Sequence, residues 1–166
     1  MILGMSTATY TFLHVLVSIV GIVSGLVVVF GLLTAKQLDR WTAIFLATTA
    51  VTSISGFGFP FERLLPSHIL GIMSLAVLAF AIPALYVFHL AGAWRWIYVI
   101  GSSVALYFNV FVLVVQCFEK VPALHALAPT QNEPPFVVAQ LAVLVVFGVI
   151  TVLATVRFHP ERVRPA

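Results

Sequence analysis

Long apolar stretches alternate with short polar segments along the whole chain. Five stretches are apolar over most of their length, and they cover residues 10–33, 41–59, 67–91, 94–118 and 136–158. Each is long enough to cross a bilayer, because a helix needs about 20 residues to span the hydrocarbon core. The pattern therefore predicts an all-α, polytopic transmembrane helix bundle of five spans, built as a single domain over residues 1–166.

Charged residues, glycines and prolines separate the apolar stretches. Lys36, Asp39 and Arg40 form the first connection, and residues 56–60 predict a helix end with aromatic anchors at the membrane interface. Pro83 predicts a kink in the third helix. Residues 121–135 contain four prolines and are expected to form the longest loop. No Lys or Arg precedes the first stretch, which is too long for a signal-peptide core, so we expect it to remain as a span.

The amino-acid composition indicates that lipid, and not water, surrounds most of the chain. Hydrophobic residues make up 62% of the chain and charged residues 8%. A soluble domain carries about 25% charged residues. We therefore expect the lipid bilayer to surround most of the chain. Cys117 is the single cysteine, which excludes an internal disulfide and a CxxC redox or zinc motif.

The basic residues predict an orientation in the membrane. Six lie beside one face of the bundle: Lys36, Arg40, Arg95, Arg157, Arg162 and Arg164. The other face has two, Arg63 and Lys120. Cytoplasmic loops are enriched in Lys and Arg, so the amino end is expected outside and the carboxyl end in the cytoplasm. The scattered basic residues form no cluster that would bind nucleic acid, and the short loops favour a bacterial inner membrane.

Polar residues within the spans recur at helical spacing. Such residues should face the interior of the bundle, because a polar group facing lipid is costly. With the predicted orientation, most of them lie in the outer half of the membrane. We therefore expect a polar pocket that opens to the outer face and binds a ligand through His14, Thr52, Ser55, Asn109, Gln116 and Gln140. The alternative is that these groups only bond neighbouring helices and hold the bundle together.

Histidines and carboxylates raise the possibility of a cofactor. His14 and His68 are the candidate ligands of a haem b. His14, His68, His125 and Glu119 are candidate metal ligands, although no two of them have a tight ligand spacing such as HxxxH.

Few residues could support catalysis. Asp39 is the single Asp, and it lies at the face opposite the outer polar groups. No Lys lies within a span, and there is no nucleotide-binding fingerprint. The sequence favours a non-enzymatic membrane subunit or small-ligand binder that works as a homo-oligomer or in a larger membrane complex. Two alternatives remain: an oligomeric channel or transporter, and a redox subunit that carries haem b or a metal.

Overall fold

A computed structural model describes residues 2, 4–59 and 66–159. Its helices are α1 (Thr7–Leu33), α2 (Asp39–Ser55), the 3₁₀ helix η1 (Gly56–Gly58), α3 (Pro66–Tyr86), α4 (Trp94–Lys120), α5 (Pro122–Leu127) and α6 (Pro134–Arg157). Five segments are long and apolar enough to span a membrane: α1, α2 with η1, α3, α4 and α6. The prediction of an all-α bundle with five spans is confirmed.

Two features differ from the sequence-based expectation. The helix α5 lies within the connection that was expected to be a loop. The helix α3 ends at Tyr86, so residues 87–91 form a turn and are not part of the span. His89 and Leu90 have positive φ values of 47° and 58°, a conformation that terminates a right-handed helix. Pro83, within the last turn of α3, lacks the N–H that an uninterrupted helix would use.

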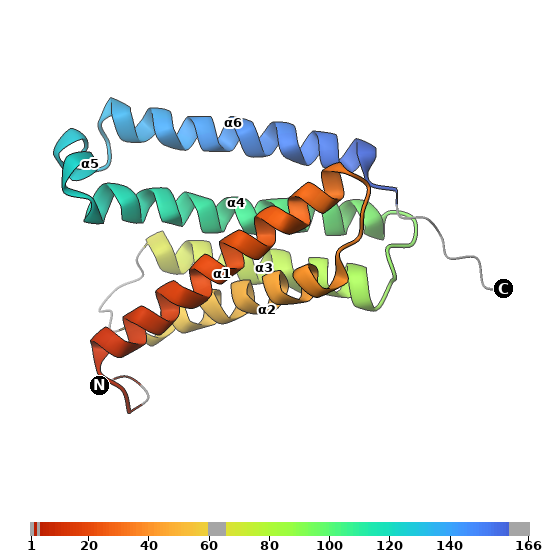
Figure 1. Cartoon of the computed structure of the whole chain (residues 1–166), viewed down its shortest axis with the longest axis horizontal. Coiled ribbons are helices and arrows are strands. Elements are labelled where there is room, and N and C mark those ends of the chain that lie inside the picture. The colour runs from red at the N-terminus through yellow and green to blue at the C-terminus, as the bar shows by residue number, and fades with distance from the viewer. Residues whose placement is uncertain (1, 3, 60–65, 160–166) are drawn as a thin grey trace.

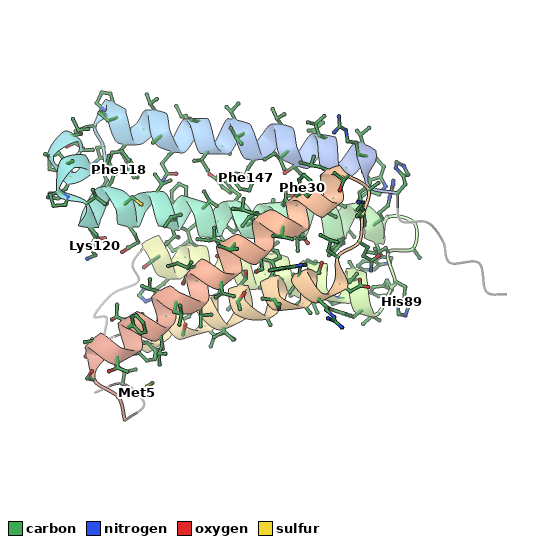
Figure 2. The ribbon with its side chains drawn as sticks, viewed as in Figure 1. Met5, Phe30, His89, Phe118, Lys120 and Phe147 are labelled. Carbon is green, nitrogen blue, oxygen red and sulfur yellow. The ribbon has the colours of Figure 1, made fainter. Side chains whose placement is uncertain are left out.

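The long helices alternate in direction, so the bundle has two ends (Figure 1). The first turns of α1, α3 and α6, the last turns of α2 and α4, and the helix α5 lie at one end, which we call the N-terminal end. The opposite end is the C-terminal end. Figure 2 shows Lys120 at the former and His89 at the latter.

Four helices pack around a common centre, and α6 covers one side of them. Neighbouring helices are in contact in the order α1, α2, α3, α4 and back to α1. The helix α6 packs on α4 and on α1, and Phe147 points from α6 toward α4 (Figure 2). The helix α1 crosses its neighbours obliquely: its first turns lie beside α2 and its last turns approach α6 (Figure 1).

A glycine allows α1 to pack closely at its crossing point. A Cβ atom at Gly25 would lie 2.6 Å from Leu106 Cδ1 and 2.8 Å from Phe45 Cε2. Both of those side chains are fully buried. Small residues are common where membrane helices approach one another, because lipid supplies no hydrophobic drive and van der Waals contact must hold the helices together.

Hydrogen bonds link the helices at the C-terminal end of the bundle. The Arg95 guanidinium donates to the carbonyl of Phe158, the residue that follows the last turn of α6, with a distance of 2.7 Å. A cation is favourable there because the free carbonyls of a helix C-terminus carry partial negative charge. The hydroxyls of Thr42 and Tyr98 lie 3.2 Å apart in a fully buried hydrogen bond between α2 and α4.

The helix α6 is the least covered of the five spans. Within its most apolar window, 6% of residues are buried, compared with 39% in α1 and in α4. Its exposed residues include many valines and leucines, among them Val145, Val149 and Val152. Such a face would be unfavourable in water but is the ordinary surface of a helix in contact with lipid.

The substitution Gly25→Ala should destabilise the bundle by about 1–3 kcal/mol, because the added methyl group overpacks Leu106 and Phe45. Gly148→Ala is the matched control, since a Cβ at Gly148 would meet no atom within 4 Å. Ala favours helix over Gly by about 1 kcal/mol, so the control should be neutral or stabilising. Unfolding of the detergent-solubilised protein, followed by circular dichroism, measures both effects. Equal effects of the two substitutions would contradict this packing.

The loop before α6 depends on the charge of Glu133. Desolvation raises the pKa of this carboxyl, but hydrogen bonds from the Thr130 hydroxyl and from backbone N–H groups outweigh it, and the pKa lies below its ordinary value. The Thr130 hydroxyl donates to Glu133 Oε1 at 2.9 Å, and the backbone N–H of Asn132 donates to Oε2 at 3.1 Å. A depressed carboxyl pKa means that these bonds stabilise the fold above the ordinary pKa and are lost as the pH falls through the folded-state pKa.

Acidification should therefore loosen this loop. Protection of the Thr130 and Asn132 amides against hydrogen exchange, relative to intrinsic rates, should fall as the pH drops through the carboxyl range. Glu133→Gln keeps an acceptor without the charge and should show weak protection that does not change with pH. Protection that is unchanged by acid in the unsubstituted protein would show that the ionised carboxyl does not order the loop.

Candidate functional site

A cleft with both apolar and polar lining residues lies between the four central helices, in the half of the bundle toward the N-terminal end. Its volume is about 110 Å³. All four helices and η1 contribute to its wall. The polar lining residues are His14, Ser18, Thr52, Ser53, Ser67, Ser74 and Asn109, and the rest are Ile22, Gly56, Leu70, Gly71, Phe108 and Val112.

The helix α1 presents a polar face to α2 along one side of the cleft. Tyr10, His14 and Ser18 follow one another at intervals of four residues and so share one face. The Tyr10 hydroxyl donates to the Ser55 carbonyl at 2.7 Å. The Ser18 hydroxyl lies 3.4 Å from Thr52 Oγ1 and donates at 2.7 Å to the carbonyl of His14. These bonds hold the first turns of α1 against the end of α2.

The imidazole of His14 bonds the last residue of α2. His14 Nδ1 lies 2.8 Å from Ser55 Oγ, and the Ser55 hydroxyl is positioned to donate to the Thr52 carbonyl at 3.2 Å. Both bonds can form together only if Nδ1 carries the proton and donates to Ser55, because a hydroxyl has one proton. A neutral His14 in that tautomer has an unprotonated Nε2, which can accept a hydrogen bond.

An aromatic segment follows α2 and contacts both α1 and α3. The Phe59 ring packs edge-on against Tyr10 and His14, with centroid distances of 5.1 and 5.3 Å. The Phe57 ring lies 5.3 Å from that of His68, which is buried on α3. A Cβ atom at Gly58 would collide with the Tyr10 hydroxyl, so a larger residue at this position would displace the Tyr10 ring. The sequence pattern predicted interfacial aromatic anchors here, and the structure shows that the rings pack on histidines.

Asn109 lies at the inner limit of the cleft. Its Nδ2 donates to Thr49 Oγ1 at 3.0 Å and links α4 to α2. Gly21 of α1 lies beside the same pair. Closer to the C-terminal end, Phe45 and Leu106 are fully buried around Gly25, so the polar lining ends at Asn109.

Ser74 is a lining residue that the sequence analysis missed. Its side chain is 3% exposed, and its hydroxyl has no hydrogen-bond partner. Ser67, Gly71 and Ser74 all line the cleft and recur at helical spacing along α3. That stripe of small and polar residues was the signal available in the sequence.

The six predicted ligand-binding residues do not all meet. His14, Thr52 and Asn109 line the cleft, and Ser55 bonds His14 beside it. Gln116 is exposed, and its amide lies 3.3 Å from Glu119 Oε2. Gln140 is buried between α6 and α4, where Nε2 donates to the Phe111 carbonyl at 3.2 Å and Oε1 has no partner. The cleft therefore forms from the four central helices without α6.

The candidate metal ligands are dispersed. His125 on α5 is exposed, and Glu119 forms a surface ion pair of 2.9 Å with Lys120. Among the described residues, no three His, Cys, Asp or Glu side chains lie close enough to hold a metal ion. Arg63 and Glu62 lie outside the described residues, as do Arg162 and Arg164. The metal site stays a prediction that this geometry does not support.

The haem prediction depends on His14 and His68, and both side chains contact the aromatic segment of residues 57–59. Pockets that hold cofactors and drug-sized ligands have volumes of roughly 300–1,000 Å³. The cleft, with about 110 Å³, is smaller. Its dimensions suit a ligand of a few atoms and give the haem prediction no support.

Comparison with protein-family models, curated proteins and solved structures returns no match for this chain. The fold defines the class of protein by itself: five apolar helices make this a small multi-pass integral membrane protein. A more specific function must be argued from the cleft.

The tautomer of His14 can be measured directly. Nitrogen-15 NMR of histidine-labelled protein, at mildly alkaline pH where ordinary imidazoles are neutral, should show His14 protonated at Nδ1. Ser55→Ala removes the acceptor and should shift His14 toward the Nε2–H form. Ser18→Ala is the matched control, because Ser18 bonds the His14 carbonyl and not its ring. An unprotonated Nδ1 in the unsubstituted protein would reverse the assignment.

Proposed function

We propose that this membrane protein is a non-enzymatic binder of a small polar ligand, which enters the cleft from the N-terminal end of the bundle. The observation that carries the proposal is the Ser74 hydroxyl, which is buried at the cleft wall without a partner. An unsatisfied buried polar group costs about 1–3 kcal/mol. A bound ligand that bonds the hydroxyl would remove this cost.

Other buried serines show that Ser74 could have been satisfied within its own helix. The hydroxyls of Ser24, Ser53 and Ser103 each donate to the carbonyl four residues earlier, at distances of 2.6–2.8 Å. This bond is the usual way for serine to be tolerated in a membrane helix. Ser74, a lining residue of the cleft, does not make it, and its buried hydroxyl has no other partner.

Catalysis finds less support in the same residues. His14 and Ser55 are in contact, as in a base–nucleophile pair, but such a pair needs the serine to donate to the imidazole and a third group to orient the base. Here the Ser55 hydroxyl is positioned to donate to the Thr52 carbonyl. No carboxylate, thiol or lysine is among the described residues that line the cleft.

A channel through the centre of the bundle also finds less support. Phe45 and Leu106 close the space around Gly25 beneath Asn109. A polar path would have to open between these side chains. Transport, association with other copies or with a partner, and residence in a bacterial inner membrane stay predictions.

We further propose that the N-terminal end, and hence the cleft, faces away from the cytoplasm. Lys36, Arg40, Arg95 and Arg157 belong to the C-terminal end of the bundle, and Lys120 belongs to the N-terminal end. Enrichment of Lys and Arg on the cytoplasmic side supports this orientation.

Cysteine labelling tests access and orientation together. With Cys117 replaced by Ala, Ser74→Cys carries a single thiol of nearly the size of the native side chain. A small membrane-impermeant methanethiosulfonate reagent, added to intact cells, should modify it. Ser102→Cys is the matched control and should stay unmodified, because Ser102 is also buried in a membrane-spanning helix but does not line the cleft.

The alternative outcomes have separate meanings. Modification of Ser74→Cys in inverted vesicles alone would keep the cleft and reverse the orientation. Lack of modification of Ser74→Cys by the neutral and smaller methyl methanethiosulfonate, in protein that is folded by circular dichroism, would show that the cleft is closed and would overturn the proposed function.

A further inference from the structure

We infer that the ligand of the cleft is a neutral molecule of no more than about six non-hydrogen atoms that both donates and accepts hydrogen bonds, as a primary amide does. This inference rests on the proposed function and specifies its ligand class. Four properties of the cleft support it: its size, its lack of charge, its polar groups and the helix ends beside it.

The volume sets the upper limit on ligand size. A dry cavity of about 150 Å³ in another protein holds benzene, which has six heavy atoms. The cleft has about 110 Å³. It therefore suits a compact ligand of that size or smaller.

The lining disfavours an ion. The described residues that line the cleft include no acidic or basic side chain, apart from the imidazole of His14. An ion that leaves water for a site at membrane depth needs an opposite charge or several strong dipoles to offset the lost hydration. A neutral ligand needs only its own hydrogen bonds to be replaced.

The polar groups left over after internal bonding include both donors and acceptors. The Ser74 hydroxyl has no partner and can donate. His14 Nε2 is an acceptor in the tautomer that satisfies Ser55. Asn109 uses one N–H toward Thr49, which leaves a second N–H and the carbonyl oxygen of its amide. A ligand with a carbonyl and an N–H or O–H group matches this set.

The helix ends beside the cleft carry opposite partial charges. Ser53 and Gly56 belong to the end of α2, and Ser67 and Leu70 belong to the start of α3. The macrodipole is negative at a helix C-terminus and positive at an N-terminus. Their combination favours a dipolar ligand over an ion of either sign.

Three small molecules with the same heavy-atom skeleton separate these possibilities: acetamide is neutral, acetate is an anion and acetamidinium is a cation. The reporter is Leu70→Cys in full-length protein with Cys117→Ala, because Leu70 lines the cleft without contributing a polar group. The measurement is the rate at which methyl methanethiosulfonate, a neutral reagent within this size limit, modifies this thiol. We expect acetamide to give a saturable loss of reactivity and the two ions to give none.

Second substitutions test whether the named groups bind acetamide. Ser74→Ala or Asn109→Leu in the reporter protein should raise the acetamide concentration needed for protection about tenfold, the value of one net hydrogen bond. Gln116→Leu is the matched control and should leave protection unchanged, because Gln116 is exposed outside the cleft.

Failure of this inference is distinguishable from failure of the proposed function. If the Leu70→Cys thiol of the folded protein does not react, the cleft is closed and the proposed function fails. If it reacts but acetamide does not protect it, the ligand class is wrong. Protection by acetate or acetamidinium in place of acetamide would assign an anionic or cationic ligand and overturn the inference.

Discussion

The fold depends on one constraint, which is that hydrocarbon offers no partner to a hydrogen-bonding group. Several hydroxyls in the spans meet it locally by donating to the carbonyl four residues earlier, as Ser24, Ser53 and Thr151 do. Side chains with a longer reach meet it across helices. Tyr10 and His14 bond the end of α2, and Asn109 bonds its middle. Interhelical hydrogen bonds of this kind contribute modestly to stability, and their stronger effect is to fix which helix faces lie together.

The oblique path of α1 explains why the cleft exists at one end and not at the other. Near the centre of the bundle, Gly25 allows the α1 backbone to lie against Leu106 and Phe45, and this region is fully packed. Toward the C-terminal end, α1 approaches α6 (Figure 1), and Arg95 ties the end of α6 to α4. Toward the N-terminal end, the first turns of α1 lie beside α2, and the cleft, which α3 and α4 also line, lies in this half of the bundle.

The number and kind of elements could be predicted from the sequence, because runs of about 20 apolar residues have no other common explanation. Helical spacing also selected His14, Thr52 and Asn109, which line the cleft in the structure. The same reasoning selected Gln116 and Gln140, which do not line it. Spacing reports which residues share a face, and it does not report which helix that face meets. The helix α6 packs outside the four-helix centre, so Gln140 faces α4 and not the cleft. Ser74 was missed because the hydroxyl of a serine in a membrane helix ordinarily donates to a carbonyl of the same helix. That Ser74 lacks this hydrogen bond is visible only in the structure.

Ser74 and Ser102 together show what defines a site in such a bundle. Both hydroxyls are buried, and that of Ser74 has no partner, whereas the Ser102 hydroxyl is close enough to the Tyr98 hydroxyl to interact with it. Ser102 lies on the closed side of Gly25, in the buried core of α4. Ser74 lies at the wall of a space large enough for a few atoms, beside His14 and Asn109. In the proposed function, the buried hydroxyl of Ser74 serves to bind the ligand. The structural difference is that Ser74 lines the cleft and Ser102, one turn along α4 from Leu106, does not.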